Sequence, residues 1–209
     1  MKAASREALA TSQTRLDEIL GGDNNVATAA QALATVKPIK GRGVRKRVGL
    51  GGDWLTIIDE SYNASPVSME ASFQVLKASE PSSGGRRIAV LGDMLEMGER
   101  SPLLHAALAE PLQANGVDLV FCCGPNMKRL FDRLPTAMQG AWAENSAALA
   151  PRIAQALRGG DCVMVKGSLG SRMALIVDAL SALGDTGTPA PNSTSNDTNG
   201  KTARAVQQG

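Results

Sequence analysis

The chain has 209 residues, of which 43% are hydrophobic and 3% aromatic, so it is long enough for one domain with an aliphatic core. Its formal net charge of +2 arises from 22 Lys and Arg against 20 Asp and Glu, which argues against a nucleic-acid surface or an anionic membrane as a partner. No apolar run approaches the roughly 18 residues of a membrane span. Residues 1–14 lack the apolar core of an export signal, so we expect a cytoplasmic protein.

The first 37 residues have a helical composition. Asn24 or Asn25 is a candidate cap for a helix over residues 26–36, in which the apolar residues fall on one side. That apolar face has no local segment to pack against. The sequence P-I-K-G-R-G at residues 38–43 then indicates a linker.

Short apolar runs alternate with longer helical segments in the rest of the chain. Residues 44–50 and 54–58 flank Gly51-Gly52-Asp53, a pattern typical of a hairpin. Strands are predicted at residues 55–58, 87–91, 119–123, 140–143 and 162–166. Helices are predicted at residues 66–79, 102–115, 126–134, 146–158 and 171–183. This alternation predicts a parallel sheet covered by helices on both faces. Residues 184–209 are rich in Gly, Thr, Pro, Asn and Ser and are expected to form a disordered tail.

The three cysteines and the single histidine do not form a metal-binding pattern. Cys122, Cys123 and Cys162 all lie in apolar, strand-like runs, which indicates reduced thiols in a core. His105 lies within a predicted helix, where a lone histidine is usually packed or half-exposed. We therefore expect neither a metal site nor a catalytic histidine.

Polar side chains follow the first strand of this alternation. Asp59 and Glu60 end the strand, Tyr62 and Asn63 come next, and Pro66 suits the first turn of a helix. Ligands of α/β sheets bind at the carboxyl ends of the strands. There a carboxylate can accept hydrogen bonds from ribose hydroxyls, while the tyrosine and the asparagine can stack on or bond a base. The alternative is a satisfied strand end, with Ser61 or Asn63 capping the next helix.

Two later strands also end in polar groups and are expected at the same edge. Asp93 and Glu96 follow the strand at 87–91 and place anions beside a helix start. Lys166 and Ser168, together with free backbone N–H groups, suggest a site for a carboxylate or phosphate after the last strand. Each pattern also has a plainer explanation, a capped loop in the first case and a strand-end lysine with a helix cap in the second.

Four stretches resemble, in order and spacing, signatures of the Mur ligase family, specifically of its D-alanyl-D-alanine-adding branch. They are K-G-R-G at 40–43, D-E-S-Y-N-A-S-P-V-S-M at 59–69, V-L-G-D-M-L-E-M-G at 90–98 and V-K-G-S-L-G-S-R-M at 165–173. The resemblance covers residues 24–183 and departs from the common pattern at Glu60, Ser65 and Leu169. It implies a Rossmann-like three-layer α/β/α domain with a mostly parallel sheet over residues 44–183. Residues 1–37 would then be the helical end of a central ATPase domain, joined by the linker at 38–43.

The resemblance also implies an activity: ATP-dependent, ADP-forming addition of D-alanyl-D-alanine to UDP-N-acetylmuramoyl-tripeptide in bacterial peptidoglycan-precursor synthesis. It assigns ATP binding to Arg42, Asp59, Glu60, Tyr62 and Asn63. It assigns the dipeptide and acyl-phosphate side to Asp93, Glu96, Lys166, Gly167 and Ser168. Which of Asp93 and Glu96 meets the dipeptide ammonium stays open.

The phosphate-binding machinery of such a ligase is not recognisable in the sequence. The run T-N-G-K-T at 198–202 resembles the end of a P-loop, but Ser195 occupies the position of a required glycine. The γ-phosphate and Mg²⁺ are therefore expected on the central domain and the UDP-sugar on the N-terminal domain of the family. We expect a monomeric C-terminal fragment that turns over little or nothing alone. The alternatives are a non-catalytic nucleotide- or dipeptide-binding module and an inactive remnant, while a folate-type ligase is disfavoured by the second and third signatures.

Overall fold

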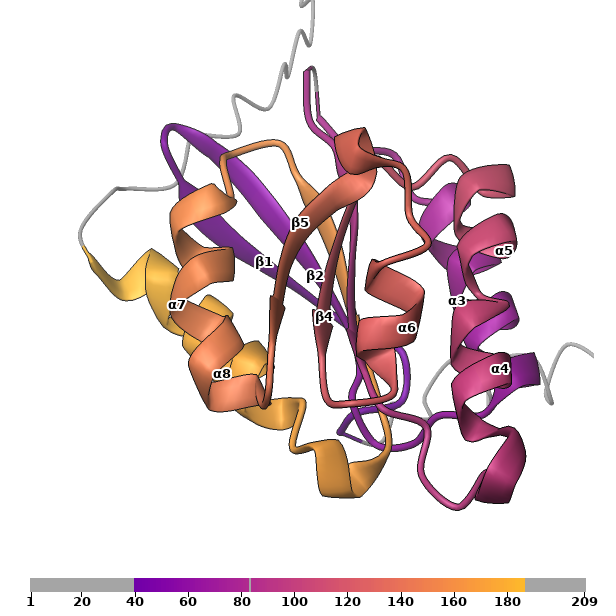
Figure 1. Ribbon diagram of the computed structural model, residues 1–209. Helices are drawn as coiled ribbons and strands as arrows, with labels where there is room; N and C mark the ends of the chain where they lie inside the picture. The colour runs from indigo at the N-terminus through magenta and orange to yellow at the C-terminus, as the bar shows by residue number, and fades with distance from the viewer. Residues whose placement is uncertain (1–39, 83, 187–209) are drawn as a thin grey trace, which may run out of the picture. The chain divides into compact units, whose positions relative to one another are not determined.

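The computed structural model describes residues 40–82 and 84–186 (Figure 1). Within these ranges six strands form one sheet in the order β1-β2-β6-β3-β4-β5, in which only β1 runs antiparallel to its neighbour. The strands are β1 (Val44–Leu50), β2 (Asp53–Glu60), β3 (Arg87–Gly92), β4 (Leu119–Cys123), β5 (Gln139–Ala143) and β6 (Cys162–Lys166). The helix expected at 26–36 and the proposed ATPase remnant lie outside the described residues.

The predicted hairpin joins β1 to β2. Gly51 and Gly52 have φ of 61° and 85°, the left-handed values that both central residues of a type I′ turn require. The antiparallel register runs from Val44 opposite Asp59 to Leu50 opposite Asp53, so β2 is longer at both ends than the predicted strand.

Helices cover both faces of the sheet (Figure 1). One face carries α3 (Pro66–Lys77), α4 (Ser101–Ala106), α5 (Ala109–Ala114) and α6 (Met127–Phe131). The other face carries α7 (Ser146–Ala156) and α8 (Ala174–Ser181). Short 3₁₀ helices are η1 (Gly98–Arg100), η2 (Thr136–Met138), η3 (Leu169–Ser171) and η4 (Ala182–Thr186). The predicted three-layer α/β/α fold is confirmed.

The core consists of two aliphatic layers, one on each side of the sheet. Along β3, Ile88 and Val90 pack toward α7 and α8, whereas Ala89 and Leu91 pack toward α3 to α6. All four side chains are fully buried, as expected of a parallel strand covered on both faces. The three cysteines are buried free thiols, as predicted from the sequence.

Helix boundaries differ from the prediction in three places. The helix expected over 102–115 is two helices, because Pro111 has no N–H to donate to the carbonyl of Ala107 and its ring crowds that carbonyl. The helix expected from residue 171 begins at Ala174, since η3 and the left-handed Arg172 (φ 54°) precede it. Regular structure also continues to Thr186 in η4, instead of ending at residue 183.

The order of the strands creates a topological switch point at one edge of the sheet. The connections from β2 to β5 run on the α3 face, and α7 then returns the chain on the opposite face to place β6 between β2 and β3. The chain leaves β6 toward one face and leaves both neighbouring strands toward the other, which defines a switch point at the carboxyl edge. No helix in the described ranges is long and apolar enough to cross a membrane.

Candidate functional site

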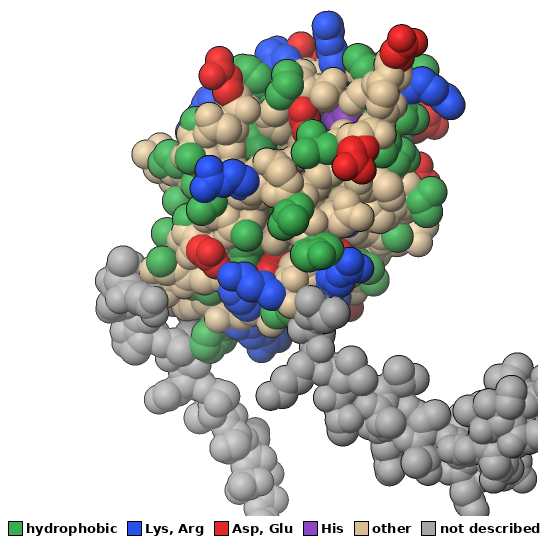
Figure 2. Space-filling view, turned by 90° about the horizontal axis from the view of Figure 1, so that it is seen from below, with side chains coloured by type: hydrophobic (Ala, Val, Ile, Leu, Met, Phe, Trp, Pro, Cys, Tyr) green, Lys and Arg blue, Asp and Glu red, His purple; other side chains and the backbone are tan. Residues whose placement is uncertain are grey.

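The first hollow at the carboxyl edge lies where the linker meets the ends of β2 and β6. We call this pocket of about 170 Å³ the linker cleft. Its lining residues are Gly41, Arg42, Glu60, Tyr62, Asn63, Ser65, Ser68 and Lys166. The structure thus brings together four of the five residues assigned to ATP, with Lys166 from the other assigned group. Figure 2 views this edge and shows basic, acidic and hydrophobic side chains interspersed over it.

The linker is held at the end of β2 because the side chain of Arg42 stacks on the ring of Tyr62. The guanidinium of Arg42 lies 4.4 Å from the centre of the Tyr62 ring, a cation–π geometry. The backbone N–H of Tyr62 donates to the carbonyl of Gly41 at 3.2 Å. A Cβ at Gly41 would lie 2.9 Å from the Tyr62 Cβ, and its φ is +82°, so glycine is needed for this close approach. Arg42 is therefore positioned in the cleft by local structure.

Lys166 forms the floor of the cleft and is only 3% exposed. Its Nζ donates to the carbonyl of Asn63 at 2.9 Å and lies 3.6 Å from Oε2 of Glu60. Burial lowers the pKa of Lys166, while the nearby Glu60 carboxylate raises it and Arg42 lowers it further. The cleft holds two cationic side chains and one carboxylate, a balance that suits a phosphate group.

Asp59 does not line the cleft. It lies next to Glu60 in β2, so its side chain points to the opposite face of the sheet, and it is fully buried. One oxygen, Oδ1, accepts from the N–H and the hydroxyl of Ser61 at 3.1 and 2.6 Å, whereas Oδ2 has no partner among residues 40–82 and 84–186. The expected direct contact between Asp59 and a nucleotide is not supported by this geometry.

The cap of α3 also differs from both residues considered in the sequence. The Oγ of Ser65 accepts from the N–H of Ser68 at 3.3 Å, and the Oγ of Ser68 accepts from the N–H of Ser65 at 2.8 Å. This reciprocal capping box leaves Ser61 and Asn63 out of the helix cap. The polar residues between β2 and α3 therefore remain available to shape the linker cleft.

Asp93 holds a turn instead of facing a ligand. Its Oδ1 accepts from the N–H of Met127 at 2.8 Å, and its Oδ2 accepts from the N–H and Nδ2 of Asn126, both at 3.2 Å. A Cβ at Gly124 would lie 2.5 Å from this carboxylate, so the turn after β4 closes tightly over it. Glu96, by contrast, is exposed and has no partner within the described part of the chain. Of the two candidates for the dipeptide ammonium, only Glu96 has a free carboxylate.

Gly167 and Ser168 connect the exits of β6 and β3. The Oγ of Ser168 accepts from the N–H of Leu95 at 2.9 Å, and its own N–H donates to the carbonyl of Asp93 at 3.2 Å. A Cβ at Gly167 would lie 2.6 Å from Cγ of Met173, so glycine is required by packing. Only Lys166 of the K-G-S sequence lines the linker cleft, so the three residues do not share this pocket.

His105, in α4, is hydrogen-bonded to the loop that follows β3. The N–H of Met94 donates to Nε2 at 2.9 Å, which makes Nε2 an acceptor and places the ring proton on Nδ1, 2.6 Å from the carbonyl of Ser101. The ring is fully buried, so the expectation of a packed histidine is confirmed.

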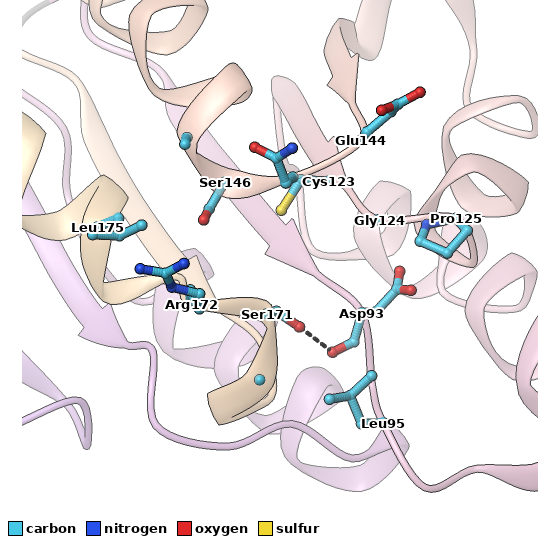
Figure 3. A pocket seen from close by; sticks show the side chains of 13 residues that line it. Asp93, Leu95, Cys123, Gly124, Pro125, Glu144, Ser146, Ser171, Arg172 and Leu175 are labelled. Carbon is cyan, nitrogen blue, oxygen red and sulfur yellow. Dashed lines mark hydrogen bonds between the residues drawn. The ribbon is translucent and has the colours of Figure 1, made fainter.

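A second pocket, of about 260 Å³, lies beyond β6 at the exits of β3, β4, β5 and β6 (Figure 3). We call it the edge pocket. Its lining residues are Asp93, Leu95, Cys123, Gly124, Pro125, Glu144, Asn145, Ser146, Ala147, Gly170, Ser171, Arg172 and Leu175. Neither Ser146 nor Arg172 was assigned a role from the sequence. The one available signal was Asn145, a typical helix-capping residue two positions after the strand predicted at 140–143.

Within residues 40–82 and 84–186, no group of three or more His, Cys, Asp or Glu side chains could hold a metal ion. The carboxylates of the edge are spread out or engaged with backbone N–H groups, as at Asp93. The described residues therefore offer no preformed cluster of metal ligands, and no step through Mg²⁺ is assigned to them.

Comparison with known proteins agrees with this arrangement. Residues 41–169 match the model of the family described as Mur ligase, glutamate ligase domain. The UDP-N-acetylmuramoyl-tripeptide–D-alanyl-D-alanine ligase of Rickettsia prowazekii is 30% identical over 161 residues, covering 77% of this chain and 34% of the relative. The ligase of the same name from Mycobacterium bovis is 32% identical over 178 residues, covering 76% of this chain and 34% of the relative.

A solved structure, the MurF ligase of Thermotoga maritima in complex with ADP, superposes with a TM-score of 0.63 at 25% identity, covering 81% of this chain and 36% of that one. The chain thus spans about a third of the length of the relatives it matches. The family model covers more than half of the chain, including the linker cleft and the loops of the edge pocket up to Leu169. The chain therefore belongs to the Mur ligase family.

Proposed function

We propose that this chain acts as the C-terminal domain of an ATP-dependent, ADP-forming ligase that adds D-alanyl-D-alanine to UDP-N-acetylmuramoyl-tripeptide. The observation that carries the proposal is the linker cleft, where Arg42, Tyr62 and Lys166 converge at the switch point of the sheet. The names of the relatives support the substrates, and the ADP complex of the Thermotoga maritima ligase supports the nucleotide.

The reaction class needs two steps. The terminal carboxylate of the tripeptide takes the γ-phosphoryl group of ATP to give an acyl phosphate and ADP. The amine of the dipeptide then attacks the acyl carbon, and phosphate leaves as the amide forms. Both steps develop charge on phosphate oxygens, which fixed cations stabilise best in a partly desolvated cleft.

Each cleft residue has a role in this scheme. Arg42 presents a planar guanidinium that can bind a phosphate with two hydrogen bonds, and its position on the linker lets it follow domain closure. Lys166 uses one of its N–H groups on the carbonyl of Asn63, which leaves donors for a phosphate or a ribose hydroxyl. Glu60 raises the pKa of Lys166 against the lowering by burial, and it can accept from ribose hydroxyls. Tyr62 supports Arg42 by stacking.

The remaining phosphate chemistry is assigned to the central domain of the family. The 209 residues contain no complete P-loop motif, since Ser195 stands at the first glycine position of the nearest match. We therefore propose that the chain by itself binds nucleotide weakly and turns over little. Its contribution is the surface that closes over ATP and receives the dipeptide.

The test is a reconstitution assay. The full chain is mixed with a separately produced N-terminal and central-domain fragment of a relative, and dipeptide-dependent ADP release and the ligated product are measured. We expect activity in the mixture and none from either component. Arg42→Gln should abolish most of the activity, whereas Arg133→Gln, which removes the same charge from an exposed turn just after α6, should leave it unchanged. Activity of the chain alone would contradict the assignment of phosphate chemistry to another domain.

A folded chain that binds ADP but remains inactive in every mixture would favour the alternative of a non-catalytic nucleotide-binding module. A folded chain with affinity for neither ADP nor the dipeptide would favour an inactive remnant. In the first case the Arg42→Gln variant still serves as a control, because it should remove ADP binding only if the linker cleft is the nucleotide site.

A further inference from the structure

We infer that His105 is a positioning residue: through its hydrogen bond to Met94 it fixes the loop after β3, and so it sets the position of the Glu96 carboxylate. The inference rests on the proposed function, in which Glu96 is the free carboxylate that can meet the dipeptide ammonium. It gives a role in substrate binding to a buried histidine that was expected only to pack.

The loop that follows β3 is attached to two other elements through its backbone. The N–H of Met94 donates to Nε2 of His105 in α4 at 2.9 Å. The N–H of Leu95 donates to the Oγ of Ser168 after β6, also at 2.9 Å. The carbonyl of Asp93 accepts from the N–H of Ser168 at 3.2 Å. Three successive residues are therefore held from both sides, by α4 and by the segment that leaves β6.

Glu96 is the next residue, and its backbone shows the effect of these anchors. Its φ is 63°, in the left-handed region, where Arg172 is the one other residue with a side chain among those that the structure describes. Such a conformation costs free energy and persists only where the surrounding structure imposes it. The Glu96 side chain has no partner in the described ranges that would impose it. The constraint therefore comes from the backbone on either side of Glu96.

On the C-terminal side, this constraint passes through His105. After Glu96 the chain enters η1 and α4, and the bond between Met94 and His105 joins positions that are 11 residues apart. The bond thus closes a loop that contains Glu96. Without it, Glu96 is free to relax to an ordinary backbone conformation, which moves its carboxylate. His105 is fully buried and does not reach a substrate, so it acts only through the loop.

The chemistry of the imidazole ring explains why a histidine suits this position. Nδ1 lies 2.6 Å from the carbonyl of Ser101, so it carries the ring proton and leaves Nε2 as the acceptor for Met94. Both His105 and Met94 are fully buried, so solvent does not offer this N–H another acceptor. A leucine would fill the space but leave the N–H unpaired, whereas a glutamine can bring an oxygen to nearly the same place.

A purely structural histidine would make the same contacts, so stability and substrate binding have to be measured separately. The assay is the reconstituted ligase mixture, with the KM measured for D-alanyl-D-alanine and for ATP. His105→Leu should raise the KM for the dipeptide by about tenfold and change the KM for ATP by less than about twofold. His105→Gln should retain most of the dipeptide affinity. Ile153→Ala, which removes buried volume on the opposite face of the sheet, should lower the melting temperature without changing either KM.

A double-mutant cycle shows whether His105 acts through Glu96. Glu96→Gln alone should raise the KM for the dipeptide by about tenfold, because it removes the charge that faces the ammonium. Adding His105→Leu to Glu96→Gln should then raise the KM by less than about twofold further, since there is no carboxylate left to misplace. A histidine with only a structural role would instead multiply the effect of Glu96→Gln.

The chain alone provides an independent measurement, because His105 is its only histidine. The ring ¹⁵N resonances of the full, histidine-labelled chain should show a protonated Nδ1 and an unprotonated Nε2, the tautomer that the bond from Met94 requires. The amide resonances of Leu95 and Glu96 should move strongly in His105→Leu and weakly in His105→Gln. If His105→Leu does not fold, His105→Asn takes its place, since the shorter side chain still reaches the carbonyl of Ser101 but not the N–H of Met94.

Several results would overturn the inference. An active wild-type mixture in which His105→Leu leaves the KM for the dipeptide unchanged, or multiplies the effect of Glu96→Gln, would leave His105 a structural role while the proposed function stands. A ring protonated at Nε2, or amides of Leu95 and Glu96 that do not respond to His105→Leu, would have the same meaning. A wild-type mixture without activity would remove the proposed function and, with it, the role of Glu96 on which the inference rests.

Discussion

Replacing Asp93 by asparagine tests whether this carboxylate is a structural group or a ligand-binding one. In the fold it accepts three N–H donors from Asn126 and Met127 at 2.8 to 3.2 Å, and it is 5% exposed. Asparagine keeps one acceptor oxygen but turns an NH₂ group toward donors that have no other acceptor. Hydrogen bonds to a charged group contribute about 1.5–3 kcal/mol each, so we expect the free energy of unfolding to fall by about 2–3 kcal/mol.

For a domain of this size, such a loss lowers the melting temperature by roughly 5–10 °C. The assay is thermal unfolding followed by circular dichroism, repeated as urea unfolding. Glu96→Gln is the matched control, because it removes a carboxylate from the same loop that is exposed and has no partner within the described residues. The control should unfold within about 1 °C of the wild type. An Asp93→Asn protein that is equally stable would show that the turn does not depend on Asp93, and would make this residue a ligand-binding candidate again.

Three further outcomes are expected from the same structure. Asp161→Asn should lower the free energy of unfolding by about 3 kcal/mol in urea melts, because the fully buried Asp161 is held by Arg86 through a 2.7 Å ion pair and two further bonds. Raising the pH above 9 should destabilise the wild type more than Cys123→Ala: burial raises the pKa of the Cys123 thiol from 9.0 to about 12, so the unfolded chain loses this proton first. The cost is about 1.4 kcal/mol per pH unit in that window, measured by unfolding at pH 8 and pH 10. Gly167→Ala should cost about 1–3 kcal/mol, since the new methyl group would meet Met173, and a melting temperature unchanged from wild type would contradict this packing argument.

Local sequence rules were sufficient for most of the fold. The strand at 87–91 is apolar throughout because both of its faces are covered, and the turn at Gly51-Gly52 needs left-handed backbone that glycine provides. The break at residues 107–108 was also indicated in the sequence, by Pro111 in the first turn of α5, although the prediction ran one helix over 102–115. The family signatures grouped Arg42 with Tyr62, and in the structure both residues line the linker cleft.

The different roles of two neighbouring residues in one strand were harder to predict from the sequence. Asp59 and Glu60 were predicted to share one role, yet alternate side chains of a strand point to opposite faces of the sheet. Glu60 therefore lines the linker cleft, while Asp59 is buried on the other face. Asp93 illustrates a second limit, because its partners at Asn126 and Met127 belong to a later turn that only the pairing of β3 with β4 brings close.

By itself, the sequence determined the elements of this protein, its family and the edge of the sheet at which polar groups gather, since these follow from periodicity, turn residues and motifs that are local in the chain. Only the tertiary structure decided which groups are free to bind. Ser146 and Arg172 follow different strands, and they share a pocket because α7 and α8 pack on the same face after β6 inserts between β2 and β3. Contacts of this kind depend on strand order and on hydrogen bonds between distant segments, which no local pattern in the sequence records.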